Sequence, residues 1–428
     1  MRPFAFVSAV LVTALGFPAA AQPAGAAPSN EQLDQKIRIL ERKLELAAET
    51  AAAEAAARPQ VSAGSGGLRI TAGDAEFRLR GLLQLDSRWF TGEDGTPLPD
   101  TFVFRRVRPT FQGTLGKGIG FRFTPELAGD SATLIDAYLD VALSRSVTVR
   151  AGKIKGPVGL ERLQGGGDTA FIERGLPTEL APNREVGLQF QGGKTLQWVL
   201  GAYNGTADGS NGPANDVDNR KEVAARLFYQ PSPGLGIGIA GSTGRKRGDT
   251  QLPRYRSPGQ TRITGYVAGT AFDGTHTRIS PQAFIYRGAF GLLAEYIQST
   301  QDLSLGGRSD TLTHRAWQVV GRYLLTGEQA GFGSLVPSQP YAIGKPGWGA
   351  WEIVARVGRL ALDDDADALG YVAANEEKTF DTYGLGVNGY LSRNVRIAAN
   401  YDVTRFRNFS GADRADERAL FTRLQLAF

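Results

Sequence analysis

The sequence predicts an all-β transmembrane barrel of 16 antiparallel strands, preceded by a short N-terminal helical, coiled-coil-like segment. Three observations carry this prediction. Side chains alternate between apolar and polar through residues 75–428, within an expected barrel domain of 68–428. The alternating segments run for about 10–14 residues, against ~5–6 in soluble sheets and the ~9–11 that a tilted membrane-spanning strand needs. The connections between them are short and long in turn, which is typical of an outer-membrane barrel.

The first residues have the pattern of an export signal. Arg2 is followed by an apolar run from Phe4 to Phe17 and then by three alanines at 19–21. A basic start, a short apolar run and small residues at a cleavage site are typical of a secretory signal peptide. A membrane anchor is the alternative, but the run is shorter than the ~20 residues that span a bilayer. We therefore expect residues 1–21 to be a cleaved signal peptide.

A helix with a heptad pattern is expected next. Its apolar residues recur in steps of four and three: Leu33, Ile37, Leu40, Leu44, Ala47 and Ala51. Asn30 is a candidate N-cap, and Arg58-Pro59 ends the pattern. About three heptads are marginal for an isolated helix, so we expect it to be oligomeric or docked; a solvated spacer helix is the alternative. With a Ser/Gly linker at 62–67, residues 22–67 form the expected periplasmic segment.

The alternation itself fits two kinds of sheet. In one of the last segments Val395, Ile397 and Ala399 alternate with Arg396 and Asn400. A strand between lipid and water has this pattern, and so does a sandwich strand between core and solvent. A secreted sandwich protein therefore stays open as an alternative to the barrel.

Connection lengths favour the barrel. Short turns are expected at 143–147, 192–194 and 391–394, and long loops at 156–183, 204–220, 244–275 and 363–378. Short periplasmic turns and long extracellular loops produce this asymmetry in outer-membrane barrels. Seventeen candidate strands can be traced; assigning the weakest, 261–271, to a loop leaves an even 16 and puts both ends of the barrel on the periplasmic side. Trp89, Trp198, Trp317 and Trp351 lie near strand ends, where interfacial aromatic girdles occur.

Charge composition points to small anions. The chain has ten lysines and 38 arginines and a net charge of +5. Guanidinium groups are weakly hydrated, fork-shaped cations suited to oxyanions, whereas a net +5 over this length is a weak footprint for nucleic acid. A 16-stranded barrel encloses an aqueous channel, and cations on its wall favour anions. Arg78, Arg106, Arg108 and Arg122 are expected on the polar side; the alternative is that such arginines only pair with wall carboxylates.

The sequence has few of the residues and motifs that enzymes and metal sites need. The chain has no cysteine and two histidines that are far apart in sequence, so we expect no metal site. It contains no GxSxG elbow, Walker loop or HExxH motif. We therefore expect a protein that is not an enzyme and needs no cofactor.

Residues 156–183 are the expected constriction. Loops of this length are usually functional or disordered, and the apolar residues Leu160, Leu163, Phe171, Ile172 and Leu176 need a surface to pack on. Folding into the channel would bury them and place Arg162 and Arg174 at the narrowest point. The alternative is that each arginine anchors the loop to a wall carboxylate such as Glu126 or Asp140. Gly165–Gly167 is interpreted as flexible loop.

Several stretches resemble one family of outer-membrane channels. They are FRLRGLLQLD (77–86), FRRVRPTFQGTL (104–115), GKIKGPVGLERL (152–163), FIERGLPTELAPNREVGLQ (171–189), YLLTGE (323–328), GAWEIVAR (349–356) and the terminal RLQLAF. In this order they resemble the phosphate-selective porin O and P family across nearly all of 68–428. The resemblance implies a homotrimeric 16-stranded porin in the outer-membrane lipid, with loops folded into each channel and an arginine ladder leading to a central anion site.

The resemblance also implies the site residues. The anion-binding and constriction set is Arg105, Arg106, Arg162, Arg174 and Asp136; the ladder and lumen set is Arg78, Arg122, Arg254, Arg256 and Arg262. Inorganic phosphate, polyphosphate or another small anion is the implied substrate. The GLE[KR] motif has arginine here, at position 162, and Gly165–Gly167 contains no lysine, so a general anion porin remains an alternative, as does a structural or adhesin barrel.

Overall fold

The computed structural model describes residues 29–91, 98–212, 219–248, 252–373 and 375–428, without the side chains of residues 51–57. The chain divides into two compact units, Met1–Arg58 and Pro59–Phe428. The expected signal peptide, residues 1–21, lies outside the described residues.

Helix α1 (Asn30–Ala57) makes up the described part of the first unit. Ser29 accepts a hydrogen bond from the main-chain N–H of Gln32 (3.3 Å), while the Gln32 side chain accepts one from the N–H of Ser29 (3.2 Å). This reciprocal capping box satisfies two free N–H groups, so Ser29, rather than the expected Asn30, is the N-cap. The helix ends just before Arg58-Pro59, as predicted. Within the described part of the chain, no helix has the length and apolarity to cross a membrane.

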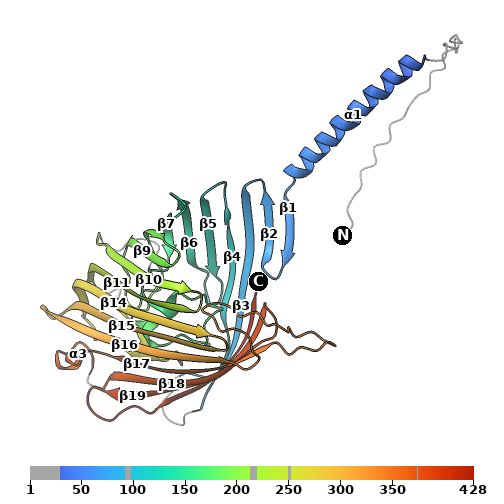
Figure 1. Ribbon diagram of the computed structural model, residues 1–428. Coiled ribbons are helices and arrows are strands. Elements are labelled where there is room, and N and C mark those ends of the chain that lie inside the picture. Colours follow the sequence, from blue (N-terminus) through green and yellow to red (C-terminus); the bar gives the residue numbers. More distant parts are fainter. Residues whose placement is uncertain (1–28, 92–97, 213–218, 249–251, 374) are drawn as a thin grey trace, which may run out of the picture. The chain divides into compact units, whose positions relative to one another are not determined.

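Sixteen antiparallel strands form a closed barrel in the second unit (Figure 1). They are β3 (Ala75–Phe90), β4 (Thr101–Thr114), β5 (Ile119–Glu126), β6 (Thr133–Ala142), β7 (Val147–Ile154), β8 (Glu185–Gly192), β9 (Leu196–Tyr203), β10 (Glu222–Ser232), β11 (Leu235–Gly248), β14 (Ala271–Arg287), β15 (Phe290–Leu305), β16 (Arg308–Leu324), β17 (Ala350–Ala361), β18 (Glu377–Tyr390), β19 (Val395–Asn408) and β20 (Glu417–Ala427). Each pairs with its neighbour in sequence, and β20 closes the ring on β3, with Leu424 opposite Leu85. The predicted fold class is confirmed.

The predicted Ser/Gly linker is a hairpin instead. Strands β1 (Gln60–Gly64) and β2 (Gly67–Ala72) pair with each other, and β2 pairs with the start of β3. The partner positions on β3 run only to Leu79, whereas β20 begins pairing at Leu82. The hairpin thus uses the edge of β3 that β20 leaves free.

Burial along the strands is the reverse of a soluble sheet. On β3 the side chain of Leu83 is 38% exposed, whereas Gln84 and Asp86 are fully buried. The same reversal recurs on β20, where Leu424 is exposed and Arg423 is buried. A sandwich would bury its apolar face, so the secreted-sandwich alternative is wrong. An apolar outer face against lipid and a polar inner face are the arrangement of a transmembrane barrel.

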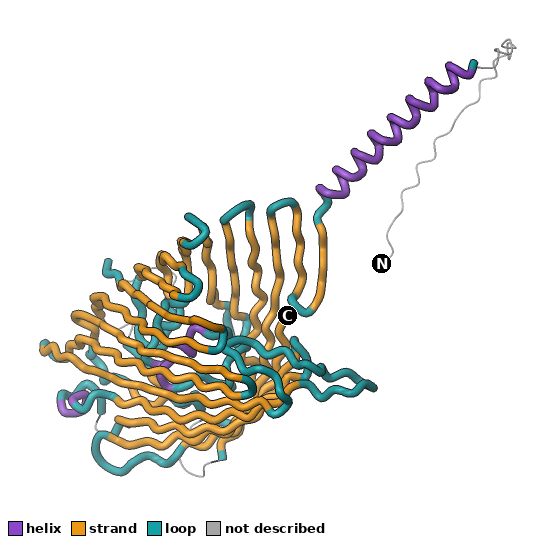
Figure 2. Tube along the Cα trace, viewed as in Figure 1, coloured by secondary structure: helices purple, strands orange, loops and turns teal. Residues whose placement is uncertain are grey.

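Connections alternate as predicted, with two exceptions (Figure 2). The β15–β16 turn at 306–307 is short although it lies at the long-loop end. The β16–β17 connection, residues 325–349, is long although it lies at the short-turn end. Strand β13 (Arg262–Thr264), from the weak candidate segment, pairs only with β12 (Tyr255–Arg256) in a separate small sheet. Assigning that segment to a loop is therefore confirmed.

Candidate functional site

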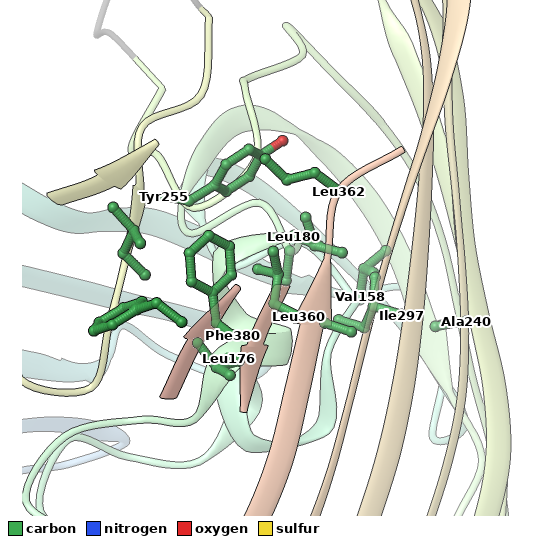
Figure 3. Close-up of a cluster of buried hydrophobic side chains, with 13 residues drawn as sticks. Val158, Leu176, Leu180, Ala240, Tyr255, Ile297, Leu360, Leu362 and Phe380 are labelled. Carbon is green, nitrogen blue, oxygen red and sulfur yellow. The ribbon is translucent and has the colours of Figure 1, made fainter. Parts of the chain in front are cut away.

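The loop at 156–183 folds into the barrel, as predicted. It contains a single α-helical turn, α2 (Leu160–Leu163), and a 3₁₀ turn, η1 (Leu176–Glu179). Val158, Leu176 and Leu180 pack against Ile297, Leu360 and Phe380 of the wall, as Figure 3 shows. Leu160 and Phe171 pack in a second apolar cluster, and Ile172 in a third. Of the five residues expected to need an apolar surface, Leu163 alone is only partly buried, because it borders open space below the loop.

Wall arginines hold this loop by its main-chain carbonyl groups. Arg356 on β17 donates to the Glu173 oxygen (2.9 Å), and Arg423 on β20 donates to the Ile172 oxygen (2.9 Å). Arg396 on β19 donates to the Thr169 and Ala170 oxygens (2.8 and 2.9 Å). Each guanidinium thus satisfies carbonyl groups that have no secondary-structure partner. Arg356 and Arg423 also pair with the wall carboxylates of Asp402 and Asp86, as the alternative of wall pairing expected. These inward-facing arginines are therefore structural.

Gly166 and Gly167 are packed against the wall, whereas Gly165 is exposed. Gln84 donates to the Gly166 oxygen (2.9 Å), and Gln425 donates to the Gly167 oxygen (3.2 Å). A Cβ atom on Gly166 would lie 3.1 Å from side-chain atoms of both Arg106 and Arg108. The interpretation of this run as flexible loop is wrong: glycine lets the loop backbone approach the wall closely.

The loop divides the open lumen into two cavities. The upper cavity, toward the long-loop end, has a volume of about 800 Å³, and the lower one about 520 Å³. Ten basic residues line the upper cavity, Arg105, Arg106, Arg108, Lys155, Arg162, Arg174, Arg184, Arg254, Arg256 and Arg262, against three acidic ones, Glu126, Glu173 and Glu179. Arg80, Arg122, Arg150 and Arg226 are among the residues that line the lower cavity. Both spaces are strongly biased to positive charge.

Five residues border both cavities and define the waist between them: Arg108, Ile135, Lys155, Gly166 and Arg184. An ion that moves from one cavity to the other passes these side chains. Three of the five carry a basic group, so the path between the cavities is lined by cationic side chains.

A β-bulge brings two successive arginines to the lumen. Gln84 on β3 is opposite Arg106, whereas the next residue, Leu85, is opposite Phe104, so Arg105 is the extra residue. A bulge interrupts the strict alternation of side chains, and both Arg105 and Arg106 line the upper cavity. A second bulge, on β6, turns Ile135 inward beside Asp136. Strict alternation would place Ile135 on the lipid face, whereas the bulge buries it inside the barrel.

Arg162 and Arg174 are held by carbonyl groups rather than by carboxylates. Arg162 donates to the Thr178 oxygen, and Arg174 donates to the Glu161 and Gln164 oxygens (3.1 and 2.9 Å). Glu126 is paired with Arg108 (2.6 Å) and Asp140 with Arg150 (2.7 Å). Anchoring of the loop by these two carboxylates, the alternative considered above, is therefore wrong.

The positive charge of these loop arginines is retained at neutral pH. Burial lowers the pKa of Arg162 to about 10, and burial with the neighbouring Arg162 charge lowers the pKa of Arg174 to about 10. Both values keep the groups protonated at pH 7. The buried Nε–H groups of Arg106 and Arg162 have no hydrogen-bond partner among the described residues. Both guanidinium groups line the upper cavity, but these two Nε–H groups are themselves covered by protein.

Two carboxylates of the loop behave differently. Burial acts to raise the pKa of Glu173, but Arg105, which donates to it at 3.0 Å, outweighs burial and holds that pKa far below its ordinary value. Burial raises the pKa of Glu179 to about 7, although Arg162 opposes the rise. Glu173 therefore neutralises Arg105 at all ordinary pH values, while Glu179 is partly protonated at neutrality.

Asp136 borders the lower cavity beside the waist, as a partner of Arg184. Arg184 donates to it at 2.9 Å, and Arg122 is 4.0 Å away. Arg184 was not among the predicted site residues. It lies at the start of β8, in the PNREVG stretch, and nothing in the local pattern distinguishes it from a wall arginine. Lys155, directly after β7, was missed for the same reason; its ammonium donates to the Gln164 oxygen (2.7 Å).

A second infolded segment, residues 204–212, positions Arg184. Gly212 donates to the Arg184 oxygen (2.6 Å), and Asn183 donates to the Ser210 oxygen (2.9 Å). Asp208 anchors this segment to the wall, because Arg278 and Ser299 donate to its carboxylate, each at 2.6 Å. The position of Arg184 thus depends on a buried ion pair on another part of the wall.

The remaining predicted residues divide by location. Arg254, Arg256 and Arg262 all line the upper cavity; Arg256 and Arg262 belong to the small β12–β13 sheet, and Arg254 directly precedes it. That sheet is fixed to the loop, since the main-chain N–H of Arg256 donates to Glu179 (3.0 Å). Arg78 borders neither cavity and pairs with Glu76. Among the described residues, no group of histidine, aspartate and glutamate side chains is arranged to hold a metal ion.

Comparisons with known proteins agree with this architecture. The family model described as phosphate-selective porin O and P matches residues 77–428. An uncharacterized protein of Caulobacter vibrioides is 26% identical over 349 residues, which cover 73% of this chain and 66% of that protein, just under two thirds of its length.

Solved structures with the same fold include three outer-membrane proteins. The channel DcaP of Acinetobacter baumannii has a TM-score of 0.56 at 11% identity, covering 86% of this chain and 99% of that one. The trimer form of OmpT of Vibrio cholerae has a TM-score of 0.53 at 12% identity (83% and 100% covered). An anion-selective porin from Comamonas acidovorans has a TM-score of 0.52 at 12% identity (83% and 100% covered). At these identities the likeness establishes the fold alone.

Proposed function

The chain belongs to the phosphate-selective porin O and P family, and from this we propose that this outer-membrane porin is selective for small oxyanions, with inorganic phosphate as the probe substrate. Family and fold are those of a channel rather than of an enzyme. The observation that carries the proposal is the lining of the upper cavity, where ten basic side chains face three carboxylates.

Permeation would proceed by weak binding in series. An anion enters past Arg254, Arg256 and Arg262, which line the upper cavity at the long-loop end. It then meets Arg106 and Arg162, which line the same cavity and whose guanidinium groups would replace part of its water shell. Binding must be favourable enough to recruit the ion and weak enough to release it.

Asp136 would moderate binding at the waist. Its carboxylate already offsets Arg184 at 2.9 Å, so an anion there meets Arg108 and Lys155 with only part of the charge of Arg184. The carboxylate would also accept a hydrogen bond from a protonated phosphate. If Asp136→Asn leaves both anion conductance and phosphate block unchanged, this role is wrong.

The deciding experiment is phosphate block of chloride current through the purified protein in planar bilayers. Arg106→Ala and Arg162→Ala should each weaken the block about tenfold, since a charge-assisted hydrogen bond contributes about 1.5–3 kcal/mol. Arg145→Ala, which removes an exposed arginine in a short turn, is the matched control and should leave it unchanged. Equal phosphate block in the wild type and all three variants would show that phosphate binds away from Arg106 and Arg162. If phosphate does not block the wild-type channel, the proposal is wrong and the protein is a general anion porin or a structural barrel.

The assembly and the ends of the chain are also part of the proposal. Residues 1–21 would be a cleaved export signal, residues 22–67 would remain in the periplasm, and residues 68–428 would form one channel of a homotrimer. The trimer form of the OmpT neighbour supports that last point. Leu33, Ile37, Leu40 and Leu44 of α1 are all exposed within its own unit, which supports association of three such helices through the heptad seam. Crosslinking of the full chain in membranes and mass measurement of the mature protein test these points.

A further inference from the structure

The unexpectedly long connection at 325–349 has two arms with different surroundings. Its inner arm, around Gly331 and Phe332, lies inside the barrel. Arg322 donates to the Gly331 oxygen (2.7 Å), and Gln164 of the constricting loop donates to the Phe332 oxygen (2.8 Å). The Phe332 ring stacks on Phe284 with centroids 5.2 Å apart. The inner arm is therefore accounted for by packing against the constriction.

The outer arm, residues 336–348, is apolar and exposed. The side chain of Ile343 is 90% exposed and that of Trp348 is 77% exposed, and Val336 and Tyr341 are exposed as well. Lys345 is the one charged residue between positions 329 and 349. A contiguous exposed apolar surface of this kind marks a contact with another protein or a membrane, whereas a loop that meets only water would be polar.

The position of the outer arm indicates that its apolar surface contacts the membrane rather than another protein. The Trp348 oxygen accepts the indole N–H of Trp351 (3.0 Å), and the Trp351 ring lies on the lipid-facing side of the wall, where it covers Gly389. The main-chain N–H of Tyr341 donates to the oxygen of Leu391 in the next short turn (2.7 Å). The connection extends past the strand ends on the right of Figure 2. The outer arm is thus continuous with the lipid-facing wall at its periplasmic edge.

We propose that residues 336–348 insert into the periplasmic leaflet of the outer membrane, with Ile343 and Trp348 among the phospholipid acyl chains near the headgroups. Tryptophan and tyrosine prefer this boundary because each ring has an apolar body and a polar group. Lys345 would extend to the lipid phosphates, as long basic side chains do at membrane edges. The same connection then contacts lipid with one arm and the constricting loop with the other. This inference does not depend on which ion the channel passes.

The absence of cysteine from the chain makes a direct test possible. A nitroxide label is placed on Ile343→Cys in the full-length protein, reconstituted in phosphatidylethanolamine–phosphatidylglycerol vesicles. Collisions with oxygen, which concentrates in lipid, and with a nickel chelate, which stays in water, are compared by electron paramagnetic resonance. Ile353→Cys on the lipid-facing wall and Arg145→Cys in a short turn supply the reference values. Unchanged single-channel conductance confirms that each labelled protein is intact.

The expected result is an oxygen-to-nickel collision ratio at position 343 close to that at 353 and at least fivefold above that at 145. A ratio equal to that at position 145 would show that the arm lies in water and would overturn the proposal. Low collision rates with both reagents would show burial against protein, either a second copy or a periplasmic partner, and would overturn it as well.

Discussion

Asp208→Asn should weaken anion selection although the side chain borders neither cavity. Asp208 accepts hydrogen bonds from Arg278 and Ser299 at 2.6 Å each, and through them it holds residues 204–212 on the wall. Removing one partner of a buried ion pair costs about 3–5 kcal/mol. The lower end applies here, because Arg278 keeps Glu222 at 2.7 Å and asparagine has the shape of aspartate.

That loss of local stability should reach the waist through the main chain. Gly212 holds the Arg184 oxygen at 2.6 Å, so a released segment frees Arg184 from its place beside Asp136. A unit charge about 7 Å from a permeating ion contributes about 0.6 kcal/mol at the dielectric constant of water, favourable for chloride and unfavourable for potassium, so each permeability changes by a factor of about 2.7 in opposite directions. The chloride-to-potassium permeability ratio of Asp208→Asn should therefore fall, by about sevenfold if the Arg184 charge is displaced completely.

A double-mutant cycle separates positioning from general damage. Permeability ratios are measured for the wild type, Asp208→Asn, Arg184→Ala and the double variant. If Asp208 acts through Arg184, the double variant matches Arg184→Ala. Asp381→Asn is the control, because it removes a carboxylate bound by Arg359 at 2.9 Å on a wall segment remote from Arg184, and it should keep the wild-type ratio. Additive effects of the two substitutions would refute the reasoning.

Three further predictions concern single positions. Gly166→Val should reduce single-channel conductance at least twofold without reversing selectivity, since its Cβ would lie 3.1 Å from side-chain atoms of Arg106 and Arg108. Lowering the pH from 8 to 6 should raise the chloride-to-potassium ratio about twofold, because burial raises the pKa of Glu179 to about 7 and its negative charge is lost as it protonates; Glu179→Gln should abolish this change. Arg78→Ala should leave conductance and selectivity unchanged, because Arg78 pairs with Glu76 away from both cavities.

Each of these has its own control or contrary result. Gly66→Ala adds a Cβ with no atom within 4 Å and should conduct like the wild type; if Gly166→Val does so too, that glycine does not limit the channel. A pH response that persists in Glu179→Gln would assign the titration to another group. A clear loss of selectivity in Arg78→Ala would extend the anion path to the periplasmic start of β3.

The barrel was predictable because one physical constraint acts along the whole chain. Lipid outside and water inside impose alternation with period two, and leucines such as Leu83 and Leu424 are exposed beside buried Gln84 and Arg423. Where the backbone departs from that period, the pattern misleads. The bulges at Arg105 and Ile135 turn inward side chains that alternation assigns to the lipid face.

The residues of the site could largely be predicted from the sequence, but the ion pairs that they form could not. The length and apolar residues of 156–183 indicated an infolded loop, and the resemblance indicated Arg105, Arg106, Arg162 and Arg174. Which arginines are neutralised depends on partners remote in sequence, such as Glu173 for Arg105 and Asp136 for Arg184. No local signal marks such pairs, so neither the waist nor the dependence of Arg184 on Asp208 could be found before the fold was known.

The zero-current potential of the purified wild-type channel across a tenfold potassium chloride gradient tests the central claim most directly. If guanidinium groups without a neutralising partner line the lumen, the zero-current potential has the sign expected for chloride as the more permeant ion. The chloride-to-potassium permeability ratio is then well above one. A potential set by potassium, or one near zero, would mean that wall carboxylates cancel the arginine charge and would contradict the account.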